Sequence, residues 1–546
     1  MQVLGQSENW LRRRPDQTDW LWVGILLIAA AVLFGIDLGG VTLRDWDEGT
    51  VAQVAREMLQ AKSDLSTWLY PTLGDEPYFN KPPLMHWLIA IAYSIGGVNE
   101  WTTRLPGAIL TAFSVPLLYG VGRELFHYRT PALFTALVYL TTLPVVRQGR
   151  LAMLDGAVLC FLMLMMWCVL RSRRDTRYAL GIGIGLGLIC LTKGVMMGVL
   201  LGAIALAFLI WDTPRLLTSP YLWLGIGLGC SPVLLWYGAQ WQHYGQSFIN
   251  THFLEQSAER VVKPVDDRSG PPWYYLLEIV KYGFPWLLFL PLGLKHAWEH
   301  RNLGWAKLAI AWGGIYFIAI SAMSTKLPWY VLPLYPALAL ICGNQLSFMW
   351  EQGRHIGVKQ PPLTPYSEVW VTVFSLFILV MTAGAVYFAG FSSPLEPDLA
   401  VIFALLALTL TVTTVLVARQ DPQFIPVLIW GTYLALVLLM ASNNWLWELN
   451  EAYPVKPVAQ FIQKNTPPNQ VIYTSFAYQR PSLDFYSDRR VIPATDNQLK
   501  KWWKDWRQIN QPYALISSEK VRSLELEPQQ IVGTFEDWVL VTRPKI

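Results

Sequence analysis

The chain has 546 residues, of which 53% are hydrophobic and only 15% charged, and it contains 27 tryptophans. This composition excludes an ordinary soluble protein and is typical of a polytopic membrane protein. The formal net charge of +4 comes from basic residues scattered between apolar runs, so no nucleic-acid partner is indicated. All five cysteines lie within apolar runs, which excludes a disulfide framework and a cysteine zinc site.

Apolar runs of about 20 residues, the length that crosses a bilayer, recur up to residue 446. The first run lacks a small-residue cleavage site, so we expect a retained anchor and not a signal peptide. Basic clusters in short loops place the amino terminus inside. We predict about thirteen spans, near 20–39, 105–122, 131–147, 151–170, 178–192, 195–211, 221–239, 274–294, 305–322, 328–349, 370–390, 399–418 and 424–446. The odd number leaves the carboxyl terminus outside.

An acidic cluster, Asp45-Trp46-Asp47-Glu48, follows the first span and opens an outer loop. Three carboxylates in four positions at a bilayer surface indicate chemistry there. The alternative is a structural role, with Asp47 capping a helix that begins at Glu48.

Two segments after this cluster are expected at the membrane surface. The apolar run 82–97 is interpreted as interfacial or re-entrant, because counting it as a span would put Arg123 and Arg129 outside while the other basic loops stayed inside. The segment directly after the acidic cluster has its apolar residues on one helical stripe, namely Val51, Val54, Met58 and Leu59. We expect that helix to lie flat on the bilayer.

Lys193 interrupts an apolar stretch that runs from Tyr178 to Trp211. A single tilted helix would hold its ammonium group near mid-membrane, at a cost of about 2.5–3.5 kcal/mol. Two short spans with a turn at Thr192-Lys193-Gly194 avoid that cost and place the amine at the outer surface. The alternative role is a lysine that snorkels to the interface without a ligand.

The same topology collects cations at the outer ends of spans, against the positive-inside tendency, and a bound anion is the simplest cause. They are Lys81, Arg104, Arg147, Arg150, Lys193, Arg260 and Lys326. Lys81 precedes two prolines that fix the backbone, so the alternative to an anion-binding role is a solvated lysine in a proline-rich turn. Lys326 has the alternative of an anchor in an aromatic belt. Asp155, five residues after Arg150, has the alternative of stabilising a helix amino terminus.

From about residue 447 the composition is that of a soluble domain. Short β-type runs occur at 471–473, 514–516 and 538–541, and a polar helix is predicted near 497–508. About 100 residues suffice for one small α/β domain. We therefore predict two domains, an all-α membrane domain at 1–446 and an extracytoplasmic α/β domain at 447–546.

The sequence contains neither a metal-ligand spacing such as HExxH nor a G-x-x-x-x-G-K-[ST] nucleotide loop. No cofactor is therefore certain, although a divalent metal ion at Asp47, Glu255 or His252 stays open. Without a nucleotide to energise the reaction, the substrate must carry its own activation.

Several motifs occur in a characteristic order along the chain. They are Asp47-Glu48-Gly49-Thr50, YFNKPPLMHWL (78–88), TRLPGAI (103–109), LDG (154–156), LTKG (191–194), HFLEQSAER (252–260), FPWLLFLP (284–291) and STKLPWYVLPLYPALAL (324–340). In this order they resemble the motifs of lipid-linked-sugar glycosyltransferases, of the type that add aminoarabinose to lipid A and mannose to proteins. The resemblance implies a GT-C type membrane bundle of about thirteen helices with a soluble extracytoplasmic domain.

The resemblance also implies roles for individual residues. Asp47 would be the catalytic carboxylate, with Glu48 beside it and Asp155 as a second acidic position near the active site. Ligands for the donor phosphate are expected among the outer cations, namely Lys81, Lys193, Arg104, Arg150, Arg260 and Lys326. Two departures, Asn80 before KPP in place of an acidic residue and Gln256 in place of a histidine, leave the metal site and the acceptor open.

We therefore expect an inverting, membrane-integral glycosyltransferase that moves a sugar from a polyprenyl-phosphate donor to a lipid, glycan or protein acceptor. The site should open at the outer face of the cytoplasmic membrane, among membrane lipids. Because the donor already has a leaving group, cations that stabilise the departing phosphate and one carboxylate that takes the acceptor proton suffice. If the acceptor is instead a phosphate oxygen, Asp47 would be needed for orientation more than for proton removal. These side chains should converge on one pocket.

Two alternatives belong to other classes of protein. A transporter or flippase of a lipid-linked saccharide would also bind an anion in a cationic cavity. Transporters, however, keep ionisable residues near mid-membrane and often have repeated halves, and no repeat is visible here. In the other alternative the carboxyl-terminal domain is the functional part and the helices are only an anchor.

Overall fold

The computed structural model describes residues 16–61, 66–264, 268–354, 366, 368–447, 455–476, 478–495, 497–499, 513–523 and 530–542. Two compact units divide the chain. Unit 1 combines Met1–Leu38, Phe79–Met85 and Arg104–Leu446, and unit 2 combines Gly39–Tyr78, His86–Thr103 and Trp447–Ile546.

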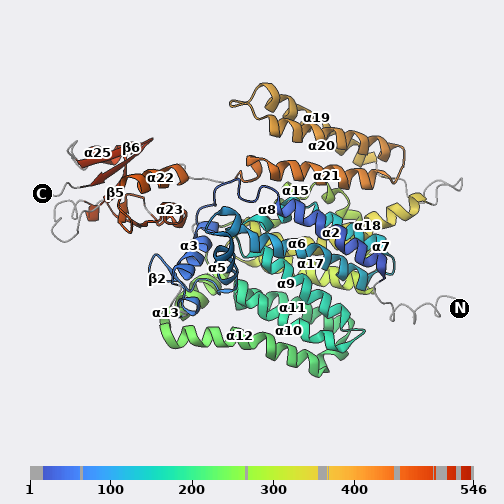
Figure 1. Cartoon of the computed structure of the whole chain (residues 1–546). Helices are drawn as coiled ribbons and strands as arrows, with labels where there is room; N and C mark the ends of the chain where they lie inside the picture. The colour runs from blue at the N-terminus through green and yellow to red at the C-terminus, as the bar shows by residue number, and fades with distance from the viewer. Residues whose placement is uncertain are drawn as a thin grey trace. The chain divides into compact units, whose positions relative to one another are not determined.

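Unit 1 is a helical bundle (Figure 1). Its longer helices are α2 (Gln17–Gly35), α6 (Glu100–Leu125), α7 (Arg129–Leu140), α8 (Leu143–Arg150), α9 (Asp155–Arg171), α10 (Leu180–Lys193), α11 (Val195–Asp212), α12 (Pro220–Tyr244), α17 (Gly304–Ala322), α18 (Tyr335–Arg354), α19 (Glu368–Gly390), α20 (Pro397–Ala418) and α21 (Phe424–Ala441). Shorter helical elements connect them: η1 (Thr176–Ala179), η2 (Pro214–Thr218), α13 (Gln246–Phe248), the π-helix η3 (Ile249–Ala258), α14 (Glu259–Val262), α15 (Tyr274–Tyr282), η4 (Trp286–Leu288), α16 (Leu290–Glu299), η5 (Pro328–Leu334) and η7 (Asn443–Trp445).

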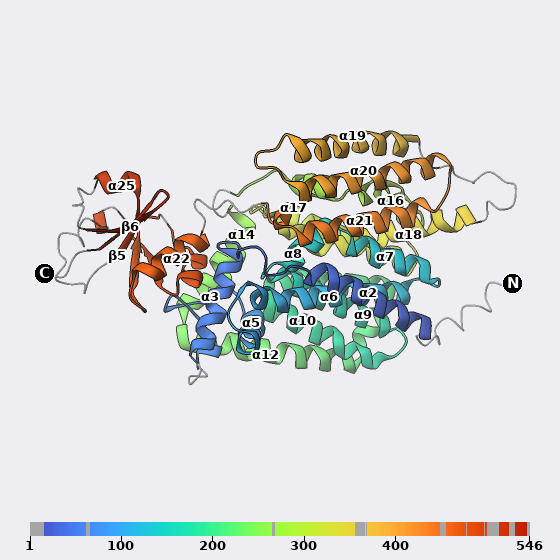
Figure 2. The same ribbon diagram turned by 45° about the horizontal axis from the view of Figure 1, so that its top comes forward.

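The helices of unit 1 lie roughly side by side in both ribbon views. Figure 2 shows α19, α20 and α21 as neighbours at one face of the bundle and α10 with α12 at the opposite face. Glycines allow α10 and α12 to approach closely, because a Cβ atom placed at Gly187 would lie only 2.0 Å from the carbonyl oxygen of Gly229. Small residues spaced four apart serve the same purpose in other membrane helix pairs.

Nine helices in the described part of the chain are long and apolar enough to cross a membrane, and the pair α7 and α8, bent by 58°, makes a tenth if it counts as one span. The predicted span at 131–147 corresponds to that bent pair. Those at 151–170 and 178–192 fall on α9 and α10, which have 17 and 14 residues. The one at 274–294 is divided among α15, η4 and α16, and each remaining predicted span coincides with one of the nine helices.

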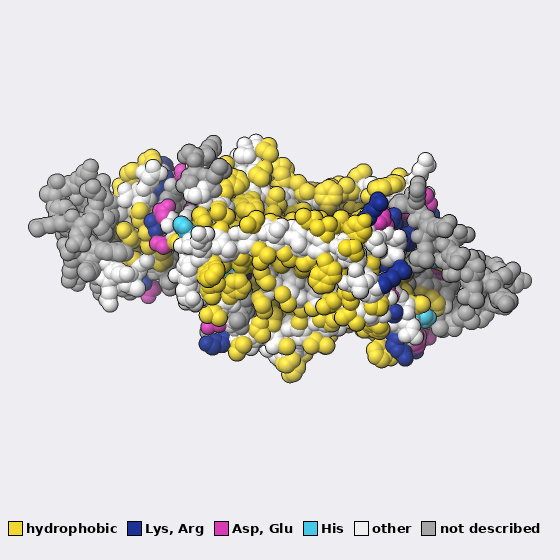
Figure 3. Space-filling model, turned by 90° about the horizontal axis from the view of Figure 1, so that it is seen from below, with side chains coloured by type: hydrophobic (Ala, Val, Ile, Leu, Met, Phe, Trp, Pro, Cys, Tyr) yellow, Lys and Arg dark blue, Asp and Glu magenta, His cyan; other side chains and the backbone are white. Residues whose placement is uncertain are grey.

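The surface agrees with a membrane environment. Figure 3 shows one face of the molecule whose middle part is covered by hydrophobic side chains, with Lys and Arg side chains gathered toward an edge of that area. The predicted fold class, an all-α polytopic membrane bundle with a small α/β part, is confirmed.

Unit 2 contains a five-stranded sheet with the strand order β4-β3-β5-β7-β6. The strands are β3 (Val471–Thr474), β4 (Arg490–Pro493), β5 (Tyr513–Ser517), β6 (Ile531–Phe535) and β7 (Trp538–Thr542). β3 pairs in parallel with β4 and β5, and β7 pairs antiparallel with β5 and β6. The three predicted strand runs are thus β3, β5 and β7, whereas most of the predicted helix near 497–508 lies outside the described residues.

Unit 2 also contains the first loop of the chain. Its other elements are α3 (Asp47–Gln60), α4 (Ser66–Leu69), the two-stranded ribbon β1 (Thr72–Leu73) and β2 (Glu76–Pro77), α22 (Val455–Asn465), α23 (Pro481–Ser487), α25 (Ser518–Ser523) and most of α5 (Leu84–Gly96). Because the loop packs with the carboxyl-terminal segment, the compact unit is larger than the predicted domain 447–546. The division at residue 446 into a membrane domain and an extracytoplasmic domain stays a prediction.

The apolar stripe of α3 differs from the sequence expectation. Val51, Val54 and Met58 are fully or almost fully buried, in a cluster with residues of α5 and with Phe485 of α23. Protein therefore covers the face that we expected to lie on the bilayer. α5 has 13 residues, which gives a length of about 20 Å, too short for a hydrocarbon core of about 30 Å.

Candidate functional site

The chain turns sharply at Lys193, as predicted. α10 ends at Lys193, Gly194 adopts a φ of 103°, and α11 begins at Val195. Only glycine adopts such a backbone readily, so the LTKG motif ends one helix and starts another. A cation in the last turn of a helix also interacts favourably with the negative end of the helix dipole.

Asp155 and Lys193 form an ion pair. The Lys193 Nζ lies 2.5 Å from Oδ1 of Asp155, which is the first residue of α9 and is buried. Lys193 also lies 5.5 Å from the centre of the Tyr330 ring, on η5. Asp155 thus occupies the helix start that was its structural alternative and is at the same time the anionic partner of Lys193.

Lys81 and Arg260 meet on one amide oxygen. Lys81 Nζ donates to Oε1 of Gln256 at 3.2 Å, and Arg260 Nη2 donates to the same oxygen at 2.8 Å. The other terminal nitrogen of Arg260 donates to the hydroxyl of Tyr330 at 3.3 Å. Gln256 of η3 and Arg260 of α14 are four residues apart on two contiguous helical segments, which places them on the same helical face.

These contacts define a cation cluster in unit 1: Lys81, Lys193 and Arg260, with Asp155, Gln256 and Tyr330. Burial and the neighbouring charges of Arg260 and Lys193 lower the pKa of Lys81 to about 7, while Asp155 has the opposite effect. The cluster therefore carries more positive charge than its one carboxylate balances. An anion placed among the three cations would relieve their mutual repulsion.

Lys326 has backbone partners. Its Nζ donates to the carbonyl oxygens of Ile320 at 3.2 Å and Ser321 at 2.7 Å, in the last turn of α17. Its backbone N–H bonds to the carbonyl of Arg268 at 2.9 Å. Lys326 therefore holds a helix end, and we leave it out of the site proposed below.

Arg104 and Arg150 lie on the Trp445 ring, with guanidinium carbons 5.1 and 4.7 Å from its centre. Arg104 donates to the carbonyl of Leu38, and Arg150 donates to carbonyls at the ends of α2 and α21, including those of Leu33 and Met440. These bonds satisfy carbonyl groups that helix ends leave without partners. They favour a structural role, and the predicted phosphate contact of both arginines stays a prediction.

Asp47 and Glu48 begin α3 in unit 2. The helix starts at Asp47 itself, after Trp46 with a φ of 61°, and not at Glu48 as the capping alternative required. The Asp47 carboxylate is partly exposed and lies 3.7 Å from the Arg44 guanidinium. Glu48 is fully buried and accepts the backbone N–H of Arg44 at 2.9 Å, so it holds the loop in front of the helix.

The first residue of the acidic cluster binds the carboxyl-terminal segment of the same unit. Asp45 accepts from Arg480 Nε at 2.6 Å and from the Ser482 hydroxyl at 2.8 Å. Arg56 of α3 donates to the carbonyl of Phe485 at 2.7 Å and pairs with Asp488. These contacts between segments more than 400 residues apart explain why the first loop and the sheet form one unit.

A group of metal-ligand type occurs away from the cation cluster. Among the described residues, the one group of three or more His, Cys, Asp or Glu ligand atoms close enough to share an ion is His296 and Glu299 of α16 with His300, which directly follows that helix. At the positions of the two sequence departures, Asn80 precedes Lys81 and Gln256 bridges two cations. These neutral side chains do not form a carboxylate and imidazole ligand set.

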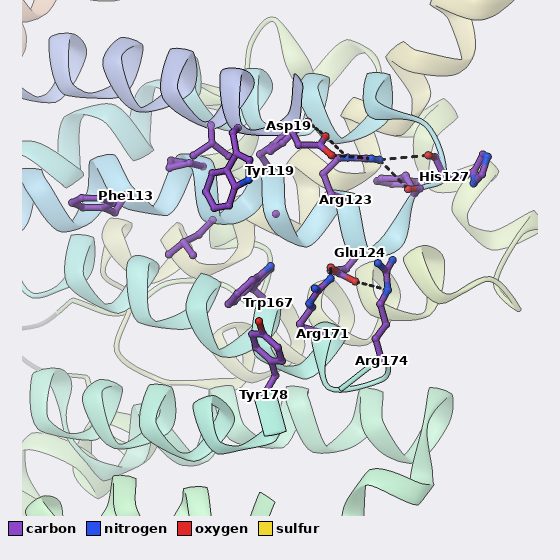
Figure 4. A pocket seen from close by; sticks show the side chains of 16 residues that line it. Asp19, Phe113, Tyr119, Arg123, Glu124, His127, Trp167, Arg171, Arg174 and Tyr178 are labelled. Atoms are coloured by element: carbon purple, nitrogen blue, oxygen red, sulfur yellow. Dashed lines mark hydrogen bonds and ion pairs between the residues drawn. The ribbon is translucent and has the colours of Figure 1, made fainter. Parts of the chain in front are cut away.

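A cavity of about 390 Å³ lies elsewhere in unit 1 and contains none of the predicted site residues. Figure 4 shows Asp19 paired with Arg123 on one side of it and Glu124 with Arg171 and Arg174 on the other. Aromatic side chains such as Phe113 and Trp167, together with aliphatic residues such as Leu117, line the rest.

Comparison with known proteins gives relatives of one kind. The family described as dolichyl-phosphate-mannose-protein mannosyltransferase matches residues 80–236. Undecaprenyl phosphate-alpha-4-amino-4-deoxy-L-arabinose arabinosyl transferase 1 of Pseudomonas fluorescens is 30% identical over 334 residues, 59% of either chain. The undecaprenyl phosphate-alpha-4-amino-4-deoxy-L-arabinose arabinosyl transferase of Shewanella sediminis is 30% identical over 352 residues, 60% of either chain. Matches to these relatives therefore span about three fifths of their length.

A solved structure covers nearly the whole chain. The crystal structure of ArnT from Cupriavidus metallidurans bound to undecaprenyl phosphate superimposes with a TM-score of 0.76, covering 95% of this chain and 98% of that one at 21% identity. The predicted resemblance to lipid-linked-sugar glycosyltransferases is thus confirmed. This chain has the GT-C type fold of ArnT and is similar in sequence to aminoarabinose transferases.

Proposed function

We propose that the chain is a membrane-integral glycosyltransferase that moves a sugar from a polyprenyl-phosphate donor to a lipid acceptor. The observation that carries the proposal is the cation cluster, in which Lys81 and Arg260 share a neutral amide oxygen and, among the described residues, have no carboxylate within ion-pair distance. The named relatives are transferases that use undecaprenyl phosphate-linked aminoarabinose, and a sugar of that type is the donor that we propose.

In this proposal Lys81, Lys193 and Arg260 hold the donor phosphate. Negative charge grows on that phosphate as its bond to the anomeric carbon breaks, and cations fixed in a partly dehydrated site stabilise it strongly. Asp155 orients Lys193 through their ion pair. The phosphate also favours the ammonium form of Lys81, whose pKa is low without an anion.

The Asp47 carboxylate takes the proton from the acceptor hydroxyl in the proposed mechanism. Direct attack of that hydroxyl on the anomeric carbon inverts its configuration, and one base suffices because the phosphate leaves without a general acid. This role depends on the motif resemblance and on the partial exposure of Asp47. Glu48 supports the loop from its buried position.

The proposed site opens at the outer face of the cytoplasmic membrane. Asp155 begins α9 and Arg171 ends it, so the cation cluster lies at the end of α9 opposite to the basic residues around Arg171. By the positive-inside rule the latter end is cytoplasmic. A transporter of lipid-linked saccharides is not favoured, because the relatives named above are transferases.

The test compares Asp47→Asn with an exposed control, Asp75→Asn, in vesicles supplied with polyprenyl-phosphate aminoarabinose and a lipid acceptor. Asp75 is exposed and pairs with Arg490 at the surface of unit 2. We expect Asp47→Asn to lose transfer while it still binds polyprenyl phosphate, and the control to keep both. Full transfer by Asp47→Asn would contradict the proposed mechanism. A native chain that transfers no sugar to any lipid would contradict the proposed function.

A further inference from the structure

His252 of η3 makes two hydrogen bonds, one through each ring nitrogen. Nδ1 lies 2.8 Å from the carbonyl oxygen of Phe79, and Nε2 lies 2.7 Å from the hydroxyl of Tyr237 on α12. A carbonyl oxygen can only accept, so Nδ1 carries the proton and Nε2 accepts from the Tyr237 hydroxyl. His252 is 3% exposed.

Tyr237 extends this series of hydrogen bonds toward the turn at Lys193. Its hydroxyl oxygen accepts the backbone N–H of Val195 at 3.3 Å. Val195 begins α11, where the first N–H groups have no partner within the helix. The hydrogen bonds thus join Val195, two residues after Lys193, to Phe79, two residues before Lys81.

Aromatic side chains keep the series in place. Phe248 stacks on the His252 ring with centroids 5.2 Å apart, and Phe79 packs edge-on against Phe248 at 6.0 Å. A Cβ atom at Gly194 would lie 3.6 Å from His252 Nε2 and 3.7 Å from the Tyr237 hydroxyl. A methyl group at Gly194 would therefore touch both side chains.

The imidazole is neutral in this arrangement. Burial lowers the pKa of His252 to about 4, and the charge of Lys81 contributes in the same direction, while the bond to Phe79 opposes them. A neutral imidazole suits a position between the turns of Lys81 and Lys193, because a third positive charge there would add to the repulsion between the two ammonium groups.

We propose that His252 and Tyr237 are positioning residues that set the separation of the Lys81 and Lys193 ammonium groups for one donor phosphate. They act through the backbones of the two lysine turns and do not touch the phosphate. The inference rests on the proposed function. Small errors in such a separation matter, because a displacement of about 1 Å can cost about 100-fold in rate.

The first experiment measures kcat and KM for the polyprenyl-phosphate donor with Tyr237→Phe, which removes only the hydroxyl group. We expect kcat/KM per folded molecule to fall about 10- to 100-fold. The control is Tyr221→Phe, a half-buried tyrosine on the same helix, which should remain at the native value. Unchanged kcat/KM in Tyr237→Phe overturns the inference.

The second experiment asks whether the two side chains act in series. His252→Leu should lower kcat/KM as Tyr237→Phe does. The double variant should be no worse than His252→Leu alone, because the loss of one hydrogen bond already interrupts the connection between the Lys81 and Lys193 turns. His252→Asn offers an amide with a donating NH2 group and an accepting carbonyl oxygen and should recover part of the loss. The proposal that the two side chains act in series is contradicted if the losses in kcat/KM of the two single variants multiply in the double variant, or if His252→Asn recovers no activity.

A binding measurement separates this inference from the proposed function. Polyprenyl phosphate without a sugar is titrated against the native chain and against Tyr237→Phe. If the native chain does not bind it, the proposed function fails. If both bind and transfer equally well, only the positioning role fails.

Discussion

The two ends of α9 hold their charges in different ways. At the Arg171 end, which we call the paired end, Arg171 and Arg174 lie 2.9 and 3.0 Å from the carboxylate oxygens of Glu124. Arg123 lies 2.9 Å from Asp19. At the Asp155 end, the partners recorded for Lys81 and Arg260 are an amide oxygen and a phenol hydroxyl.

This difference separates two reasons for placing a basic residue at a membrane surface. Arg123, Arg171 and Arg174 at the paired end all have a carboxylate partner, so membrane topology and protein stability suffice to explain these basic residues. In the cation cluster Lys193 pairs with Asp155, whereas the partners of Lys81 and Arg260 are neutral acceptors that leave their positive charge uncompensated. An anionic ligand supplies the missing partner. The comparison therefore predicts that substitutions at one end change activity and those at the other change stability.

The largest effect is expected for Lys81→Met. Removing one of three phosphate-binding cations should lower kcat/KM about 10²- to 10³-fold, the usual cost of losing one donor to a developing anion, with little change in melting temperature. The matched control is Lys295→Met, an exposed lysine on α16. Activity of Lys81→Met within threefold of native, measured per folded molecule, would mean that the cluster is not the phosphate site.

Glu124→Gln tests the paired end. It leaves Arg171 and Arg174 without their shared carboxylate, and breaking a buried ion pair costs about 3 kcal/mol. We expect a lower melting temperature in detergent with native kcat/KM in the fraction that stays folded. Glu351→Gln, an exposed glutamate on α18, is the control. Loss of transfer without loss of stability contradicts the division between the two ends.

The pH dependence of donor binding sharpens the description of the cation cluster. The pKa of Lys81 is about 7 in the absence of an anion, so above that pH the lysine must first gain a proton to bind the phosphate. The donor KM should then rise by up to about tenfold per pH unit above 7, and it should be nearly flat below. Lys81→Arg keeps its charge at all these pH values and should remove the rise.

The smallest effect is expected for Lys307→Gln at the paired end. Asp212 keeps Arg173 as a partner, at 3.2 Å, after the contact with Lys307 at 3.3 Å is lost. We expect a loss of no more than about 1 kcal/mol and unchanged transfer, measured by thermal melting and vesicle assay. A large loss of activity would show that this end takes part in the reaction.

Several features of the fold were predictable because they depend on local sequence. The length of each apolar run determines whether a helix can cross the bilayer, and all the predicted spans contain helices. The turn at Lys193 was predicted from the cost of a buried ammonium group and the neighbouring glycine. Short apolar runs of β-type residues sufficed to find β3, β5 and β7.

The sequence by itself thus determined the helices, the turn at Lys193 and the candidate cations. Only the tertiary structure decided which cations meet. Lys81, Lys193 and Arg260 gather around Gln256 and Tyr330, whereas Arg104 and Arg150 lie on Trp445 and bind backbone carbonyls. The physical reason is that an apolar run or a helix cap depends on neighbours along the chain, while the partner of a charged side chain depends on which helix ends packing brings together.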